Sequence, residues 1–181
     1  MPEDKTPFGT YPVLINEANF PDAVFRDYVS ANFDDDRNSE LSDDEIALVD
    51  EIWIPNMSGC SSLEGIRYFF NLANLQCAFN QLKTLDLSGL AYLTEVNCQN
   101  NGLTSINLAG CDRLHSLNVY ANALAYVDIT VCSDQSGNEI LTFLTATEQV
   151  VLVEMTYDEE RKLYTADLNA LNTIGNYMNT S

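Results

Sequence analysis

The sequence predicts an α/β solenoid in which short parallel strands stack from one repeat to the next. The main observation is a pattern written three times across residues 72–132 at a fixed interval, so that Leu72 recurs as Leu93 and again as Leu114. An acidic helix–loop–helix pattern precedes these repeats, and a segment rich in β-branched residues follows them. We therefore divide the chain into an N-terminal part (1–50), a repeat region (51–132) and a C-terminal part (133–181).

The repeat keeps the same type of residue at eight positions in all three copies, with no insertion between copies. Leu75 and Cys77 alternate with polar residues, as in a half-buried strand. A unit of about 21 residues cannot close a core alone, but stacked copies bury their apolar rows against one another. We expect parallel strands roughly 4.8 Å apart. The positions are Leu72, Leu75, Cys77, Asn80, Leu82, Leu85, Leu87 and Leu90, then Leu93, Val96, Cys98, Asn101, Leu103, Ile106, Leu108 and Cys111, then Leu114, Leu117, Val119, Asn122, Leu124, Val127, Ile129 and Cys132.

The order L-x-x-L-x-L-x-x-N-x-L resembles the leucine-rich repeat family, and residues 80–88 and 93–98 match its short bacterial form. The resemblance implies a right-handed solenoid. It also implies that the amides of Asn80, Asn101 and Asn122 bind backbone groups of their own and the neighbouring turn. The physical reason is that a buried turn leaves N–H and C=O groups that need partners. The alternative is three unrelated turn asparagines.

The N-terminal part begins with a lead-in, residues 1–14, which contains three prolines and which we expect to be loosely held. A helix follows, with Pro21 suited to its first position. Its apolar face is predicted to comprise Val24, Phe25, Tyr28 and Val29.

An acidic loop follows this helix and resembles the EF-hand calcium loop D-x-[DN]-x-[DN]-G-x5-E. The sixth position is Ser39 where the pattern has glycine, and a left-handed backbone there costs on the order of 1 kcal/mol. The alternative is an acidic turn whose helix caps repeat the chemistry of a calcium loop. We predict a structural calcium site with the ligands Asp34, Asp36, Asn38, Glu40, Ser42 and Glu45.

A second helix is predicted to start at Ser42, which begins a capping box with Glu45, and to have Ile46, Leu48 and Val49 as its apolar residues. Residues 51–70 are a degenerate first repeat with its strand at 52–54. This N-terminal region resembles that of leucine-rich repeat proteins from bacterial surfaces and secretions, which implies that the helices are a cap.

The C-terminal part is predicted to be a loop at 133–138 followed by a β-hairpin. We place its strands at 149–155 and 163–168, with turn chemistry at 157–161. The hairpin would cover the open end of the last repeat.

Composition excludes several classes of function. Eight basic and 27 acidic residues give a net charge of −19, which argues against nucleic acid and anionic lipid as partners. No apolar run approaches the roughly 18 residues of a membrane span. Met1 to Lys5 lacks the apolar segment of a signal peptide, so location is not decided by this region. We expect a monomer.

The chain has five cysteines, four of them at repeat positions where sister copies carry leucine or valine. Three roles are compatible with these cysteines: metal ligation, disulfide formation, or packing as small buried apolar residues. We favour the packing role. The one histidine, His115, is expected to point outward, and no catalytic residues are predicted.

The concave strand surface is the second candidate site, because amides and aromatic rings suit peptide backbones and sugars. By resemblance we expect a non-enzymatic bacterial module for adhesion, extracellular or on the cell surface, that binds protein or carbohydrate. The alternatives are a structural spacer of a larger surface protein and an accessory domain of a secreted hydrolase. The amides could also simply hydrogen-bond one another. The predicted ligand-binding residues are Asn74, Gln76, Phe79, Glu95, Asn97, Gln99, Asn118 and Tyr120.

Overall fold

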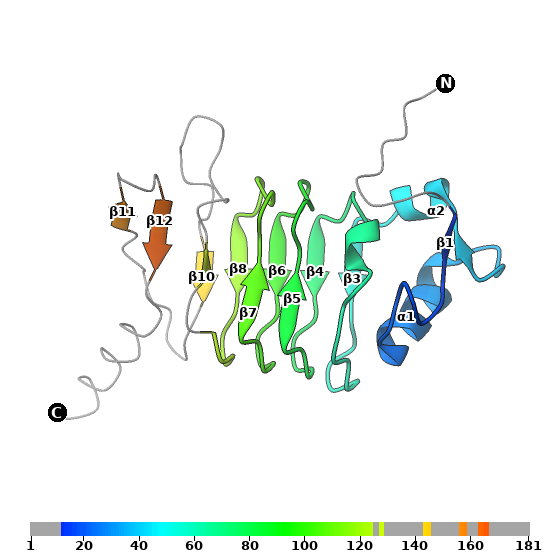
Figure 1. Ribbon diagram of the computed structural model, residues 1–181, viewed down its shortest axis with the longest axis horizontal. Helices are drawn as coiled ribbons and strands as arrows, with labels where there is room; N and C mark the ends of the chain where they lie inside the picture. The colour runs from blue at the N-terminus through cyan, green and yellow to red at the C-terminus, as the bar shows by residue number, and fades with distance from the viewer. Residues whose placement is uncertain (1–11, 125–126, 129–142, 146–155, 159–162, 167–181) are drawn as a thin grey trace, which may run out of the picture.

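The computed structural model describes residues 12–124, 127–128, 143–145, 156–158 and 163–166. Parallel strands stack into an elongated solenoid, and the two described α-helices lie beside the N-terminal end of its main sheet (Figure 1). The described elements are β1 (Val13–Leu14), α1 (Ala23–Phe33), β2 (Glu40–Leu41), α2 (Asp43–Ala47), β3 (Glu51–Trp53), the 3-10 helix η1 (Ile66–Tyr68), β4 (Asn74–Gln76), β5 (Thr84–Asp86), β6 (Glu95–Asn97), β7 (Ser105–Asn107), β8 (Ser116–Asn118), β9 (Val127–Asp128), β10 (Phe143–Thr145), β11 (Thr156–Asp158) and β12 (Leu163–Ala166).

The main sheet has five parallel strands in the order β10-β8-β6-β4-β3. Leu75 pairs with Val96 and Val96 with Leu117, so that β4, β6 and β8 follow one another at the interval of the sequence repeat. Ile52 of β3 pairs with Leu75, which is a slightly longer step along the chain. The degenerate first repeat therefore joins the same sheet despite its offset in sequence.

A second parallel pair, β5 and β7, lies across the solenoid from the main sheet (Figure 1). Leu75, Val96 and Leu117 are buried on the inner side of the main sheet, and Leu85 of β5 is buried on the opposite side. The core is thus a stack of apolar rows between two short-stranded sheets, as the alternation in the repeat predicts.

The turn asparagines Asn80, Asn101 and Asn122 bind backbone groups at the end of each strand. The amide nitrogen of Asn101 donates to the carbonyl oxygens of Cys98 and Cys77, both at 3.0 Å, the second in the preceding repeat. Its oxygen accepts the N–H of Leu82 at 3.0 Å. Asn122 repeats these contacts one unit further on. The prediction for the asparagine amides is confirmed.

Helix α1 begins at Ala23, two residues later than Pro21, because Asp22 caps it. The Asp22 carboxylate accepts the N–H of Phe25 at 3.0 Å. Its other oxygen accepts the N–H and hydroxyl of Ser61, at 2.8 and 2.7 Å, and so ties α1 to the first repeat. The predicted apolar face is correct, since Phe25 and Val29 are fully buried.

Two predictions about the N-terminal part are wrong. Part of the lead-in is ordered, because Val13 and Leu14 form β1 and pair antiparallel with Leu41 and Glu40 of β2. The helix that the capping box starts has only five residues and ends at Ala47, so that Leu48 and Val49 lie beyond it, and Leu48 is 75% exposed. Ile46 and Val49 are buried as expected.

The C-terminal part differs in part from the predicted hairpin, whose second strand, placed at 163–168, is present as β12. β10 extends the main sheet, with Phe143 paired to Ser116, where no strand was predicted. β12 pairs with residues 156–158, which were assigned in part to a turn, and also with β9. The predicted strand at 149–155 lies outside the described residues.

Helix α1 has 11 residues, and no described helix is long and apolar enough to cross a bilayer. Cys60, Cys77, Cys98 and Cys111 are free and buried, in agreement with a packing role, whereas Cys132 lies outside the described residues. Burial raises the pKa of the Cys98 thiol to about 12.

Candidate functional site

The outward side chains of β3, β4, β6 and β8 form one surface, which we call the strand face. The parallel register places Trp53 beside Gln76, Gln76 beside Asn97 and Asn97 beside Asn118. Glu51, Asn74, Glu95 and Ser116 form the neighbouring row. The fold therefore brings together five of the predicted ligand-binding residues, namely Asn74, Gln76, Glu95, Asn97 and Asn118.

Several amides of the strand face hydrogen-bond one another. The amide nitrogen of Gln76 donates to the oxygen of Asn74 at 2.8 Å, and that of Asn74 donates to Glu51 at 3.3 Å. Asn118 donates to the oxygen of Gln99 at 3.2 Å. These bonds fix the orientations of the amides and use part of their hydrogen-bonding capacity within the protein. This agrees with the alternative in which the amides simply hydrogen-bond one another.

The remaining predicted residues, Phe79, Gln99 and Tyr120, lie just beyond the strands. Phe79 is 37% exposed and has a left-handed backbone, with φ of 55°. Met57 has the same conformation in the first repeat and is 84% exposed, and its N–H donates to the carbonyl oxygen of Phe79. Two apolar side chains thus border the strand face.

Trp53 is the residue of this surface that sequence reasoning missed. It is 63% exposed, while Ile52 and Ile54 on either side are fully buried. The signal was present, since an Ile-Trp-Ile strand with buried isoleucines must direct the tryptophan outward. The degenerate register of the first repeat concealed that Trp53 belongs to the same row as Gln76.

The acidic loop gathers three of its six predicted ligands. Single carboxylate oxygens of Asp34, Asp36 and Glu45 lie within 4.8 Å of one another, and Asp34 is only 7% exposed. Glu40 is not in this group. Asn38 and Ser42 bind neighbouring carboxylates, since Asn38 donates to Asp36 at 3.0 Å and the Ser42 hydroxyl donates to Glu45 at 2.8 Å.

Local geometry explains why the loop closes. Asp34 accepts the N–H groups of Asn38 and Ser39, at 3.0 and 3.1 Å, and so turns the chain back on itself. Ser39 has φ of 67°, the left-handed conformation expected where the calcium-loop pattern has glycine. Pairing of β2 with β1 then holds the far side of the loop.

Glu45 links the loop to α2. One oxygen accepts the N–H of Asp35 at 2.9 Å, and the other accepts the N–H of Ser42 at 2.8 Å. The bond from the Ser42 N–H is the main reason that the pKa of Glu45 lies below its ordinary value. Hydrogen bonds therefore hold this carboxyl group in its ionised form, which is the form that a cation requires.

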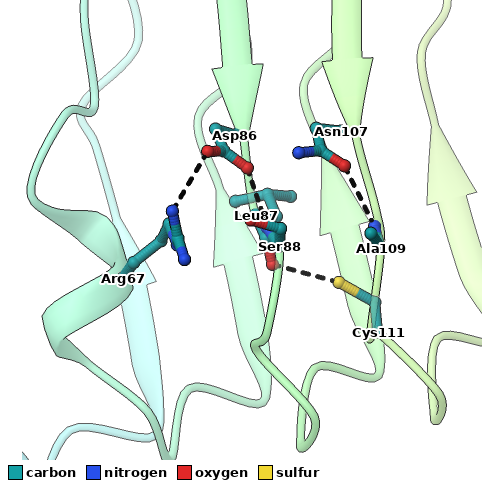
Figure 2. Close-up of polar contacts among 7 residues, drawn as sticks. All are labelled: Arg67, Asp86, Leu87, Ser88, Asn107, Ala109 and Cys111. Carbon is teal, nitrogen blue, oxygen red and sulfur yellow. Dashed lines mark hydrogen bonds and ion pairs between the residues drawn. The ribbon is translucent and has the colours of Figure 1, made fainter. Parts of the chain in front are cut away.

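A cavity of about 440 Å³ lies away from both of these sites, between the turn before α1, the segment around η1 and strand β5. Arg67 and Asp86 form an ion pair of 3.3 Å beside it (Figure 2). Asp86 also accepts the N–H of Ser88 at 3.0 Å. One repeat further on, the side chain of Asn107 accepts the N–H of Ala109 in the same way. These bonds therefore stabilise the same turn in two successive repeats.

The stacked parallel strands and the turn asparagines define a leucine-rich repeat solenoid. Solved structures that share this fold include two internalins. An internalin, InlF, from Listeria monocytogenes has a TM-score of 0.62 and 22% identity, over 78% of this chain and 40% of that one. The functional domain of InlJ from the same species, described as including a cysteine ladder, has a TM-score of 0.63 and 24% identity, over 86% of this chain and 37% of that one.

The chain thus spans about two fifths of each of these two internalin chains. At this level of identity the likeness shows the fold alone. No family model matches the chain, and no curated protein matches it in sequence.

Proposed function

We propose that this chain is a non-enzymatic binding module of a bacterial surface or secreted protein, and that it engages a protein or a glycan through the strand face. The observation that carries the proposal is the composition of that face. It presents amides, two carboxylates and an exposed tryptophan in regular rows on a sheet whose inner side is the core. Such residues match the polar groups and flat faces of peptides and sugars.

The helices and the acidic loop have a supporting role in this proposal. Asp22 and the pairing of β1 with β2 tie the N-terminal part to itself and to the first repeat. Calcium held by Asp34, Asp36 and Glu45 would join the end of α1 to the start of α2. The N-terminal elements would then cap the open edge of β3, and the strands after β10 would cap the other end.

A structural spacer with no ligand is the second candidate. Its support is that Asn74, Gln76 and Asn118 already have partners within the strand face. An accessory domain of a secreted hydrolase is compatible with the same surface, and sequence flanking this chain would distinguish it.

Substitution on the strand face separates a module from a spacer. The test variant carries Gln76→Ala, Asn97→Ala and Asn118→Ala, and the control carries Thr84→Ala, Thr104→Ala and Ser105→Ala on the opposite, exposed side. Both are compared with the unmodified chain on arrays of glycans and of extracellular matrix proteins. A module predicts a signal that the test variant loses and the control keeps, whereas equal signals from all three chains contradict it.

A further inference from the structure

The feature of the strand face that its own contacts leave unexplained is the exposed side chain of Trp53. The backbone of this residue is held in place, because its flanking isoleucines are buried and its backbone N–H donates to the hydroxyl of Tyr28 in α1 at 3.0 Å. Tryptophan is among the residues enriched at the energetic centres of binding surfaces, and this one is 63% exposed on an ordered strand.

Two carboxylates lie in the row next to Trp53. Glu51 is on the same side of β3, about 7 Å along the strand, and Asn74 separates it from Glu95 across the sheet. Both glutamates are exposed. Asn74 donates to one oxygen of Glu51 at 3.3 Å, which orients that carboxylate on the surface.

No lysine or arginine belongs to this surface among the described residues. The described basic residues are in α1, in the acidic loop, in η1, just before β5 and in the turn before β8, and none is in a strand of the main sheet. These basic residues are Arg26, Arg37, Arg67, Lys83 and Arg113. The strand face therefore offers an aromatic ring and negative charge with no cation of its own.

We propose that Trp53, Glu51 and Glu95 form a subsite for an arginine side chain in an extended segment of a protein partner. A guanidinium group stacks on an indole ring and pairs with a carboxylate through two N–H groups, so one arginine satisfies both features. Adjacent amides on Gln76 and Asn97 would bind the backbone of the same segment. This inference rests on the proposed function and favours a basic protein over a glycan as the partner.

Trp53 supplies its own probe, because it is the single tryptophan of the chain. The full chain is titrated with the peptide acetyl-Gly-Arg-Gly-Arg-Gly-amide while tryptophan emission is recorded. The matched peptide carries citrulline, which has the shape of arginine without its charge. The arginine peptide is expected to change the emission in a saturable way that weakens with added salt, and the citrulline peptide is expected to leave it unchanged.

Charge-matched variants locate the contact. The double variant Glu51→Gln with Glu95→Gln should bind the arginine peptide with roughly tenfold lower affinity. Asp27→Asn with Asp112→Asn removes the same charge from exposed positions off the strand face and should leave binding within about twofold. Equal responses to both peptides, equal losses in both variants, or no change in emission would each overturn the arginine subsite.

These results are distinguishable from failure of the proposed function. Unchanged tryptophan emission, together with array binding that only the strand-face variant loses, rejects the arginine subsite and retains the module. A saturable, charge-dependent response supports the subsite even where no array component binds.

Discussion

The amide nitrogen of Asn101 donates to the carbonyl oxygen of Cys77, in the preceding repeat, at 3.0 Å. One side chain thereby joins two successive turns of the solenoid, and its oxygen binds Leu82 of the earlier turn as well. The contact explains why asparagine recurs at this position, since its amide supplies donors and an acceptor in a single plane.

Asn101→Ala should lower the free energy of unfolding by about 2–4 kcal/mol, because it leaves several buried backbone groups without partners. Urea unfolding followed by circular dichroism measures this change. Asn107→Ala is the control, since Asn107 is exposed and makes one local bond to Ala109 (Figure 2). Its cost should be below about 1 kcal/mol. Equal losses in the two variants would contradict the bridging role of Asn101.

Calcium should raise the melting temperature relative to chelator, because a ligand that binds only the folded state stabilises it. Asp34→Ala with Glu45→Ala should abolish this rise. Asp43→Asn, in the same acidic stretch but outside the carboxylate group, should keep it. Identical melts of the unmodified chain with calcium and with chelator would reduce the loop to a helix-capping device.

Asp22 should make the free energy of unfolding depend on pH in the acidic range. Burial acts to raise its pKa, but hydrogen bonds from Phe25, Ser61 and Ser62 outweigh burial and leave the pKa below its ordinary value of 3.8. A carboxylate whose pKa is lower in the folded chain contributes stability above its unfolded pKa and loses it as pH falls through the folded pKa.

Asp22→Asn should therefore destabilise the chain at neutral pH by about 1–3 kcal/mol, since the amide nitrogen cannot accept the bonds from Ser61. The difference in the free energy of unfolding between the variant and the unmodified chain should become smaller below about pH 3.8. Urea unfolding at several pH values measures it, and a difference that stays constant down to the lowest pH would rule out this linkage.

The four described thiols should resist alkylation in the folded chain. Burial raises the pKa of Cys60 and Cys111 to about 12, as it does for Cys98, and the thiolate is the reactive form. Iodoacetamide at mildly alkaline pH, followed by peptide mass analysis, should label these positions only after denaturant is added. Rapid labelling of native Cys98 would be inconsistent with the packing described for it.

The sequence was most informative where contacts are periodic. A fixed interval between apolar positions determined the strands β4, β6 and β8 and their turn asparagines, because each unit repeats the environment of the last. The EF-hand-like spacing likewise placed Asp34, Asp36 and Glu45 near one another.

Prediction failed where an element depends on a distant partner. β1 has only two residues and exists through its pairing with Leu41 and Glu40, which no local pattern announces. Phe143 pairs with Ser116 across a longer stretch of chain than separates the earlier strands, and so breaks the interval of the repeats. Trp53 was overlooked for another reason: its place between two isoleucines indicated that it points outward, but the offset of the first repeat hid its register with Gln76.

The constant step between β4, β6 and β8 also bears on how such a molecule can change over generations. A gain or loss of one whole unit leaves every side chain on its original side, whereas a single-residue insertion in a strand would turn apolar residues outward. Duplication can therefore lengthen this surface in increments of roughly 4.8 Å while the ends stay the same. The length of the strand face therefore changes by whole repeats and not by single residues.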